Sequence, residues 1–83
     1  MRTRVKICGI TTKSDAVFAS DLGVDALGFV FYEGSPRFLD PELVGQISSC
    51  LHPFILRVGL FVNAKDSFVK DSINRSKINL LQF

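Results

Sequence analysis

The chain is organised around Val5-Lys6-Ile7-Cys8-Gly9-Ile10, an apolar run with one lysine and one thiol that leads into the hydroxyl residues Thr11 and Thr12. On a strand, successive side chains point to opposite faces, so Lys6 and Cys8 share a face. Cys8 falls at the carboxyl end of this predicted strand, the end at which parallel α/β sheets bind ligands. A cysteine in such a run is more often a buried, inert side chain. The rest of the sequence has to decide between these two interpretations.

The composition is that of a globular chain with a single domain. It has 83 residues, of which 47% are hydrophobic and 22% charged, proportions that are ordinary for soluble proteins. The net charge of +2 is too small to indicate a nucleic acid or a membrane as partner. No apolar run approaches the roughly 20 residues of a membrane span, and no secretory signal is visible.

The two cysteines, Cys8 and Cys50, lie far apart in the sequence and do not have metal-ligand spacing. We interpret both as reduced thiols in a reducing compartment, which indicates a cytoplasmic location and no metal site. Cys50 lies near a predicted helix end and is expected to be structural.

Hydrophobic periodicity predicts alternating strands and helices. Strands are expected at residues 5–10, 26–32, 55–62 and 78–83, and helices from Thr12 or Ser14 to Gly23, from Asp40-Pro41 to the breaker His52-Pro53, and over 66–76. The resulting order is βαβαβαβ. The strands are almost continuously apolar, which is typical of parallel sheets covered on both faces.

The ends and buried faces of the helices can also be predicted. Thr12 or Ser14 and Asp40 are typical N-caps, Pro41 suits the first helical position, and Gly23 suits a left-handed C-cap. The apolar positions expected to face the core are Ala16, Val17, Phe18, Ala19 and Leu22 in the first helix, Leu43, Ile47 and Leu51 in the second, and Phe68, Val69 and Ile73 in the third.

Four motifs, in this order and at this spacing, resemble those of phosphoribosylanthranilate isomerase. They are Val5–Thr11, Gly28–Tyr32, Ser35–Arg37 and Val58–Asn63, and Leu80–Phe83 looks like the start of the family's fourth-strand motif. The resemblance covers essentially the whole chain. It implies an α/β fold that is part of a (β/α)₈ TIM barrel, with parallel strands in βαβαβαβ order: the first three βα units plus strand 4.

The resemblance also implies an activity. The family is an isomerase of tryptophan biosynthesis, of the intramolecular aldose–ketose type. It converts N-(5'-phosphoribosyl)anthranilate, a small-molecule substrate, to 1-(2-carboxyphenylamino)-1-deoxyribulose 5-phosphate by an Amadori rearrangement, without metal or organic cofactor. Cys8 matches the family's general base, which removes the proton from C2 of the opened sugar imine. Lys6 is a candidate cation for stabilising the thiolate, or else a residue that fills the barrel interior.

Arg37 matches the family's substrate-binding arginine in the loop after the second strand. A guanidinium fork fits a carboxylate, and the anthranilate moiety carries one. Without the motif, Arg37 would be interpreted as a solvated arginine on a surface turn. With the motif, it is a predicted substrate-binding residue.

A complete barrel takes roughly 200 residues or more, so residues 1–83 are expected to be its amino-terminal part, truncated. The family's aspartate general acid and its phosphate site have no counterpart here. Two alternatives stay open beside an incomplete isomerase. One is a non-catalytic remnant that self-associates through open sheet edges. The other, a flavodoxin-like module, is disfavoured because Gly9 is the only glycine in the loop after the first strand.

Overall fold

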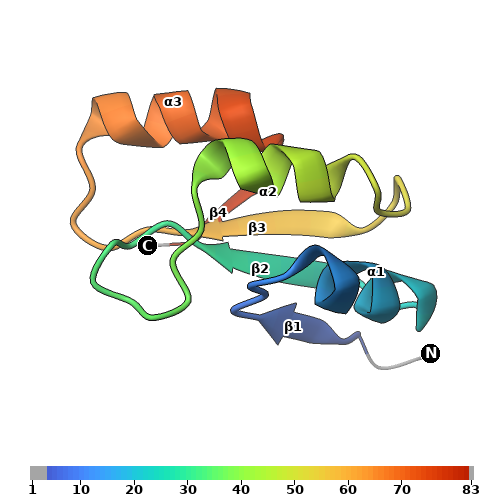
Figure 1. The fold of residues 1–83 in the computed structure, drawn as a ribbon. Helices are drawn as coiled ribbons and strands as arrows, with labels where there is room; N and C mark the ends of the chain where they lie inside the picture. The colour runs from blue at the N-terminus through green and yellow to red at the C-terminus, as the bar shows by residue number, and fades with distance from the viewer. Residues whose placement is uncertain (1–3, 83) are drawn as a thin grey trace.

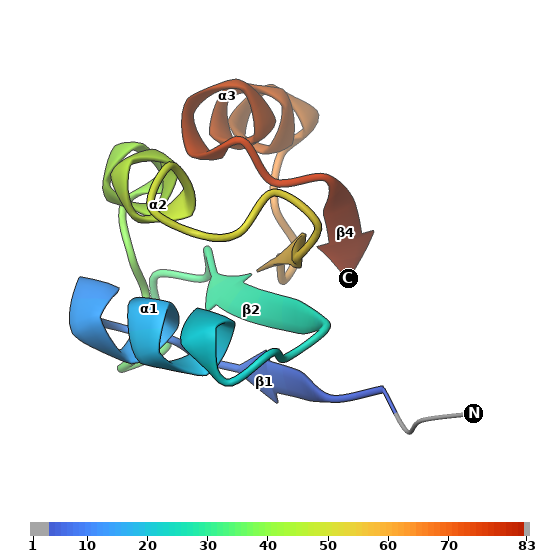
Figure 2. The same cartoon turned by 90° about the vertical axis from the view of Figure 1, so that its right-hand side faces the viewer.

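The computed structural model describes residues 4–82, which form a single parallel sheet with helices on one of its faces (Figures 1 and 2). The elements are β1 (Lys6–Cys8), α1 (Lys13–Asp21), β2 (Ala26–Val30), α2 (Pro41–Ser48), β3 (Leu56–Leu60), α3 (Asp66–Ser76) and β4 (Leu80–Gln82). The strands lie in the order β1-β2-β3-β4, and every neighbouring pair is parallel. This confirms the predicted βαβαβαβ order and the parallel sheet. Phe83, the predicted end of the fourth strand, lies outside the described residues.

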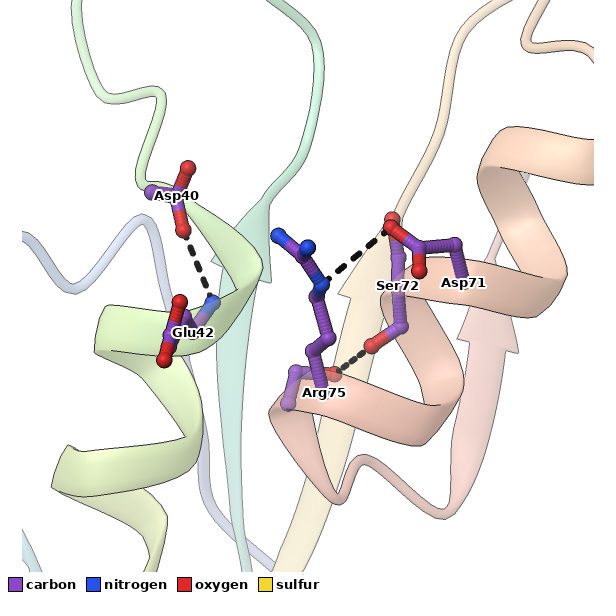
Figure 3. A network of polar contacts seen from close by, with 6 residues as sticks. Asp40, Glu42, Asp71, Ser72 and Arg75 are labelled. Carbon is purple, nitrogen blue, oxygen red and sulfur yellow. Dashed lines mark hydrogen bonds and ion pairs between the residues drawn. The ribbon is translucent and has the colours of Figure 1, made fainter.

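The helix starts are where local chemistry places them. The Thr12 side chain accepts a hydrogen bond from the Asp15 N–H at 3.1 Å, and the Asp40 carboxylate accepts one from the Glu42 N–H at 2.9 Å. Figure 3 shows the second of these caps, with Asp71 and Arg75 of α3 paired on the facing helix. Each cap satisfies an N–H group that has no partner within the helix, which confirms the predicted starts of α1 and α2.

The core lies between the sheet and the helices. It is built on Leu27 and Phe29 of β2 and on Phe31 and Phe61, which directly follow β2 and β3. These side chains belong to one cluster with Ala16 and Ala19 of α1, Val44 and Ile47 of α2, and Val69 of α3. The Phe31 and Phe61 rings are 5.3 Å apart, centroid to centroid. Phe68 and Ile73 are partly buried against this cluster, in agreement with the predicted apolar positions of α3.

Three predicted core positions are wrong. Phe18 is 66% exposed and Leu22 67% exposed, because α1 is the end helix of the row and its outer flank meets no other described element (Figure 2). Leu43 is also exposed, and Val44 is buried in its place. Successive helical residues are 100° apart, so Val44 and Leu43 cannot both face the core beside Ile47. Ile47 and Leu51 are buried as predicted, although Leu51 lies beyond the last residue of α2.

The strands are shorter than predicted. β1 ends at Cys8 because Gly9 has a left-handed backbone, with φ of +81°. The Gly9 and Ile10 N–H groups then both donate to the Gly28 carbonyl, at 3.0 and 3.2 Å, instead of continuing the ladder. Only glycine adopts this backbone conformation without strain. The turn therefore leaves Cys8 as the last residue of β1.

A close approach between α2 and α3 depends on Gly45. A Cβ atom placed on Gly45 would overlap the backbone carbonyl oxygen of Arg75 in α3. Backbone cannot move aside as a flexible side chain can, so the spacing of the two helices requires a glycine at this position.

Candidate functional site

Cys8 lies at the carboxyl edge of the sheet, in a space that Gly28 leaves open. In the parallel register, Cys8 pairs with Gly28 of β2. A Cβ atom on Gly28 would lie 3.0 Å from the Cys8 Sγ atom and 3.2 Å from its Cα. The thiol is free and exposed. Cys8 is therefore an accessible thiol, in contrast to the buried cysteine that such a run usually contains.

Lys6 and Cys8 share the face of the sheet opposite the helices. Their register partners are Ala26 and Gly28, whereas Leu27, which lies between these two, belongs to the core under the helices. The Lys6 ammonium donates a hydrogen bond to the Gln82 side-chain oxygen at 2.7 Å. β1 and β4 are the two edges of the sheet, so this bond spans the face that carries Cys8. The alternation expected from the sequence is confirmed.

Arg37 reaches the same edge from the loop between β2 and α2, which lies at the carboxyl ends of the strands (Figure 1). The loop is folded back on itself: the Arg37 N–H donates to the Ser35 hydroxyl at 3.1 Å, and the Leu39 N–H donates to the Val30 carbonyl at 3.1 Å. The Arg37 side chain lies over Gly9. A Cβ atom on Gly9 would be 2.8 Å from the Arg37 Cδ and 3.1 Å from its Nη1.

The two predicted site residues are thus brought together. Arg37 packs on the residue that directly follows Cys8, although 28 positions separate Arg37 from Gly9 in the sequence. The arrangement places an exposed thiol and a guanidinium group at the carboxyl ends of the strands, with the guanidinium next to the residue that follows the thiol. A thiol can exchange a proton with a bound molecule, and a guanidinium can hold a carboxylate through two parallel hydrogen bonds.

A second arginine, Arg57, was not recognised from the sequence, and it serves the fold. Its Nε donates to the Ser48 hydroxyl at 2.6 Å and its Nη2 donates to the Ser48 carbonyl at 3.0 Å, at the end of α2. Partial burial lowers the pKa of Arg57 by desolvation. A charged residue inside the apolar run Leu56-Arg57-Val58 was the available signal. These two hydrogen bonds join Arg57 of β3 to the end of α2, where a cation also suits the helix dipole.

Among residues 4–82 there is no group of three or more His, Cys, Asp or Glu side chains that could hold a metal ion. No helix in the described part of the chain is long and apolar enough to cross a membrane.

Comparison with known proteins gives one consistent family. Residues 5–83 match the sequence model described as N-(5'phosphoribosyl)anthranilate (PRA) isomerase. The N-(5'-phosphoribosyl)anthranilate isomerase of Geobacter sulfurreducens is 52% identical over 79 residues, which are 95% of this chain and 39% of the relative. The enzyme of Nitrosococcus oceani is 49% identical over 83 residues, 100% of this chain and 40% of the relative.

Solved structures agree with the sequence relatives. The phosphoribosyl anthranilate isomerase of Thermotoga maritima superposes with a TM-score of 0.92 at 46% identity, over 98% of this chain and 40% of that one. The Thermus thermophilus enzyme superposes with a TM-score of 0.91 at 41% identity, over 96% and 40% of the two chains. This chain therefore spans about two fifths of the length of the relatives it matches.

Proposed function

The chain belongs to the N-(5'-phosphoribosyl)anthranilate isomerase family, and we propose that residues 1–83 form the amino-terminal part of such a barrel and carry two elements of its active site. Cys8 is the general base and Arg37 binds the carboxylate of the anthranilate moiety. The observation that carries this proposal is the packing of Arg37 on Gly9, next to the exposed Cys8 thiol.

The proposed reaction is the Amadori rearrangement of N-(5'-phosphoribosyl)anthranilate in tryptophan biosynthesis. The Cys8 thiolate removes the C2 proton of the ring-opened, protonated imine. The electron pair of that C–H bond forms a C1–C2 double bond, and the imine nitrogen takes up the displaced pair. The resulting enolamine becomes the ketone when C1 gains a proton and the C2 hydroxyl loses one. An accessible thiol at the carboxyl end of a strand supports this role for Cys8.

The substrate is proposed to bind on the uncovered face. A solved phosphoribosyl anthranilate isomerase, 46% identical to this chain, is a complex with reduced 1-(o-carboxyphenylamino)-1-deoxyribulose 5-phosphate. That compound carries the benzoate group that the Arg37 guanidinium would hold by charge-assisted hydrogen bonds. A general acid and a phosphate site complete the reaction, and we assign them to barrel segments outside residues 1–83. We place the protein in the cytoplasm, with a small-molecule substrate and without nucleic acid or membrane partners.

A second candidate function is a non-catalytic partial barrel that associates with itself. Apolar side chains at both edges of the sheet favour it: Val5 is 46% exposed, Ile7 37% and Leu81 37%. Within residues 4–82, β1 and β4 each have a strand partner on one side only. Such edges invite pairing with another chain.

A hybrid barrel separates the two candidates. In it, residues 1–83 of this chain replace the matching segment of the Geobacter sulfurreducens isomerase, to which this chain is 52% identical over 79 residues. We expect the purified hybrid barrel to convert N-(5'-phosphoribosyl)anthranilate to its product, measured by chromatography of the reaction mixture. A folded, monodisperse hybrid barrel with no turnover would favour the non-catalytic candidate.

Arg37→Ala in the hybrid barrel is expected to lower kcat/KM by roughly ten- to a hundredfold, because the loss of a charge-assisted hydrogen bond costs about 1.5–3 kcal/mol. Most of the change should appear in KM, since the carboxylate is bound equally in the ground state and the transition state. Arg37→Lys is the matched control that keeps the charge and loses the fork. If Arg37→Ala has unchanged kinetics and still binds a product analogue tightly, Arg37 is a solvated surface residue and does not bind the substrate.

Gly45→Ala in the hybrid barrel is expected to lower the free energy of unfolding, although the same change in an isolated helix is worth about 1 kcal/mol in the opposite direction. The reason is the overlap of the new Cβ with the Arg75 carbonyl, which forces α2 and α3 apart. Gln46→Ala, at the exposed neighbouring position, is the control. Urea denaturation followed by circular dichroism measures the free energy of unfolding of both variants. A Gly45→Ala variant that is more stable than the parent would show that α2 and α3 can move apart without a loss of stability.

A further inference from the structure

We propose that Gly9 is a positioning residue: its missing side chain sets where the Arg37 guanidinium lies relative to Cys8. This inference rests on the proposed function, in which Arg37 holds the substrate carboxylate, and it adds a residue that acts through Arg37 without touching the substrate. Three observations carry it: the backbone conformation of Gly9, the distances to Arg37, and the anchoring of the Arg37 loop.

The backbone fixes the direction in which a Cβ atom on Gly9 would point. The φ angle is +81°, and the Gly9 N–H is held by the Gly28 carbonyl at 3.0 Å. A Cβ built on this backbone lies 2.8 Å from the Arg37 Cδ, 3.1 Å from its Nη1 and 3.5 Å from its Nε. The contact thus involves the end of the arginine side chain that would bind the carboxylate.

The arginine side chain is the part that would give way. Arg37 is exposed, and its backbone is tied to the Ser35 hydroxyl by a 3.1 Å hydrogen bond. The Gly9 backbone is held by the hydrogen bond from its N–H to the Gly28 carbonyl of β2. An added methyl group at Gly9 therefore swings the flexible guanidinium away from the Cys8 edge and leaves both backbones in place.

The chain contains a matched control for backbone strain. Gly23, after the end of α1, has a φ angle of +85°, and a Cβ atom there would meet no atom within 4 Å. Gly23→Ala carries the same left-handed penalty as Gly9→Ala but displaces no neighbour. The difference between the two variants isolates the displacement of Arg37.

The kinetic test uses the hybrid barrel. Gly9→Ala is expected to raise KM and lower kcat/KM by roughly ten- to a hundredfold, as Arg37→Ala does, with kcat less affected. Gly23→Ala should leave both constants unchanged. In an Arg37→Ala background, Gly9→Ala should cost less than twofold more, because its effect acts through the missing guanidinium. If the losses in kcat/KM of Gly9→Ala and Arg37→Ala instead multiply in the double variant, the proposal is overturned.

Two further measurements keep the inference separate from the proposed function, since neither needs isomerase activity. The Arg37 Nε–H resonance, assigned by its loss in Arg37→Ala, should move in Gly9→Ala and stay in place in Gly23→Ala. An Arg37 resonance that does not move in Gly9→Ala would overturn the proposal even in an active enzyme. If the hybrid barrel is inactive but the Arg37 Nε–H resonance moves in Gly9→Ala, the positioning role of Gly9 is supported and only the proposed function is contradicted.

The last measurement covers the case in which Gly9→Ala folds poorly. Thermal midpoints of the single and double variants are compared with that of Gly23→Ala. The contact predicts that Gly9→Ala destabilises more in the presence of Arg37 than in the Arg37→Ala background, where only strain remains. An equal loss of stability in both backgrounds, together with an Arg37 resonance that does not move, would overturn the proposal.

Discussion

Cys8→Ala in the hybrid barrel is expected to lower kcat/KM by roughly 10²–10⁴-fold, the usual contribution of a general base. The expected loss lies in kcat, because the thiolate acts on the C2 proton only in the transition state, whereas the substrate is held through other groups such as Arg37. Binding of a product analogue should therefore persist. Cys8→Ser tests the same point with a nearly isosteric side chain that is a far weaker base at neutral pH.

The control for this prediction is Cys50→Ala. Cys50 is the other free and exposed thiol, but it follows α2, away from the carboxyl edge of the sheet. Its removal should leave turnover unchanged. Near-normal turnover by Cys8→Ala, measured beside the Cys50→Ala enzyme, would remove the assignment of Cys8 as the base.

The isolated chain is expected to show no isomerase turnover and to self-associate. Its sheet exposes Val5 and Ile7 at one edge and Leu81 at the other. Phe18 of α1 and Leu22, which directly follows α1, are exposed as well. A closed barrel buries such edges, and a four-stranded sheet does not. The hydrophobic core of a chain this short rarely supplies more than about 3–5 kcal/mol of net stability. Apolar faces that stay uncovered reduce this stability further.

Light scattering and amide hydrogen exchange on the isolated chain measure this directly. We expect a molten or associating species with weakly protected strand amides. Charged substitutions at the edges, Ile7→Lys with Leu81→Lys, should reduce association, and Lys70→Glu on the exposed side of α3 is the matched control. A dilute monomer with strongly protected strand amides would contradict the instability, and turnover by that monomer would contradict the inactivity.

The sequence predicts those parts of the fold that local chemistry determines. Thr12 and Asp40 start helices because their side chains bond the first free N–H groups, whatever the rest of the chain does. The prediction that Phe18 and Leu22 face the core is wrong because their burial would need another element packed on the outer flank of α1. Hydrophobic periodicity does not show whether such a neighbour exists.

The candidate site divides in the same way. Cys8 and Arg37 can be named from motifs, and the shared face of Lys6 and Cys8 follows from the two-residue period of a strand. The contact between Gly9 and Arg37 could not be predicted, because it depends on how the loop after β2 folds back. The Lys6–Gln82 bond joins the two edges of the sheet, so it depends on the sheet's curvature, which no local pattern specifies.

The central claim, that this chain itself supplies the base side of an isomerase site, is tested most directly by mixing two fragments. The isolated chain is combined with the complementary remainder of the Geobacter sulfurreducens isomerase, and turnover of N-(5'-phosphoribosyl)anthranilate is measured on the mixture and on each fragment. We expect turnover only in the mixture, and its loss when the chain carries Cys8→Ala at equal assembly by native mass spectrometry. A one-to-one complex without turnover, or one whose turnover survives Cys8→Ala, would contradict the claim.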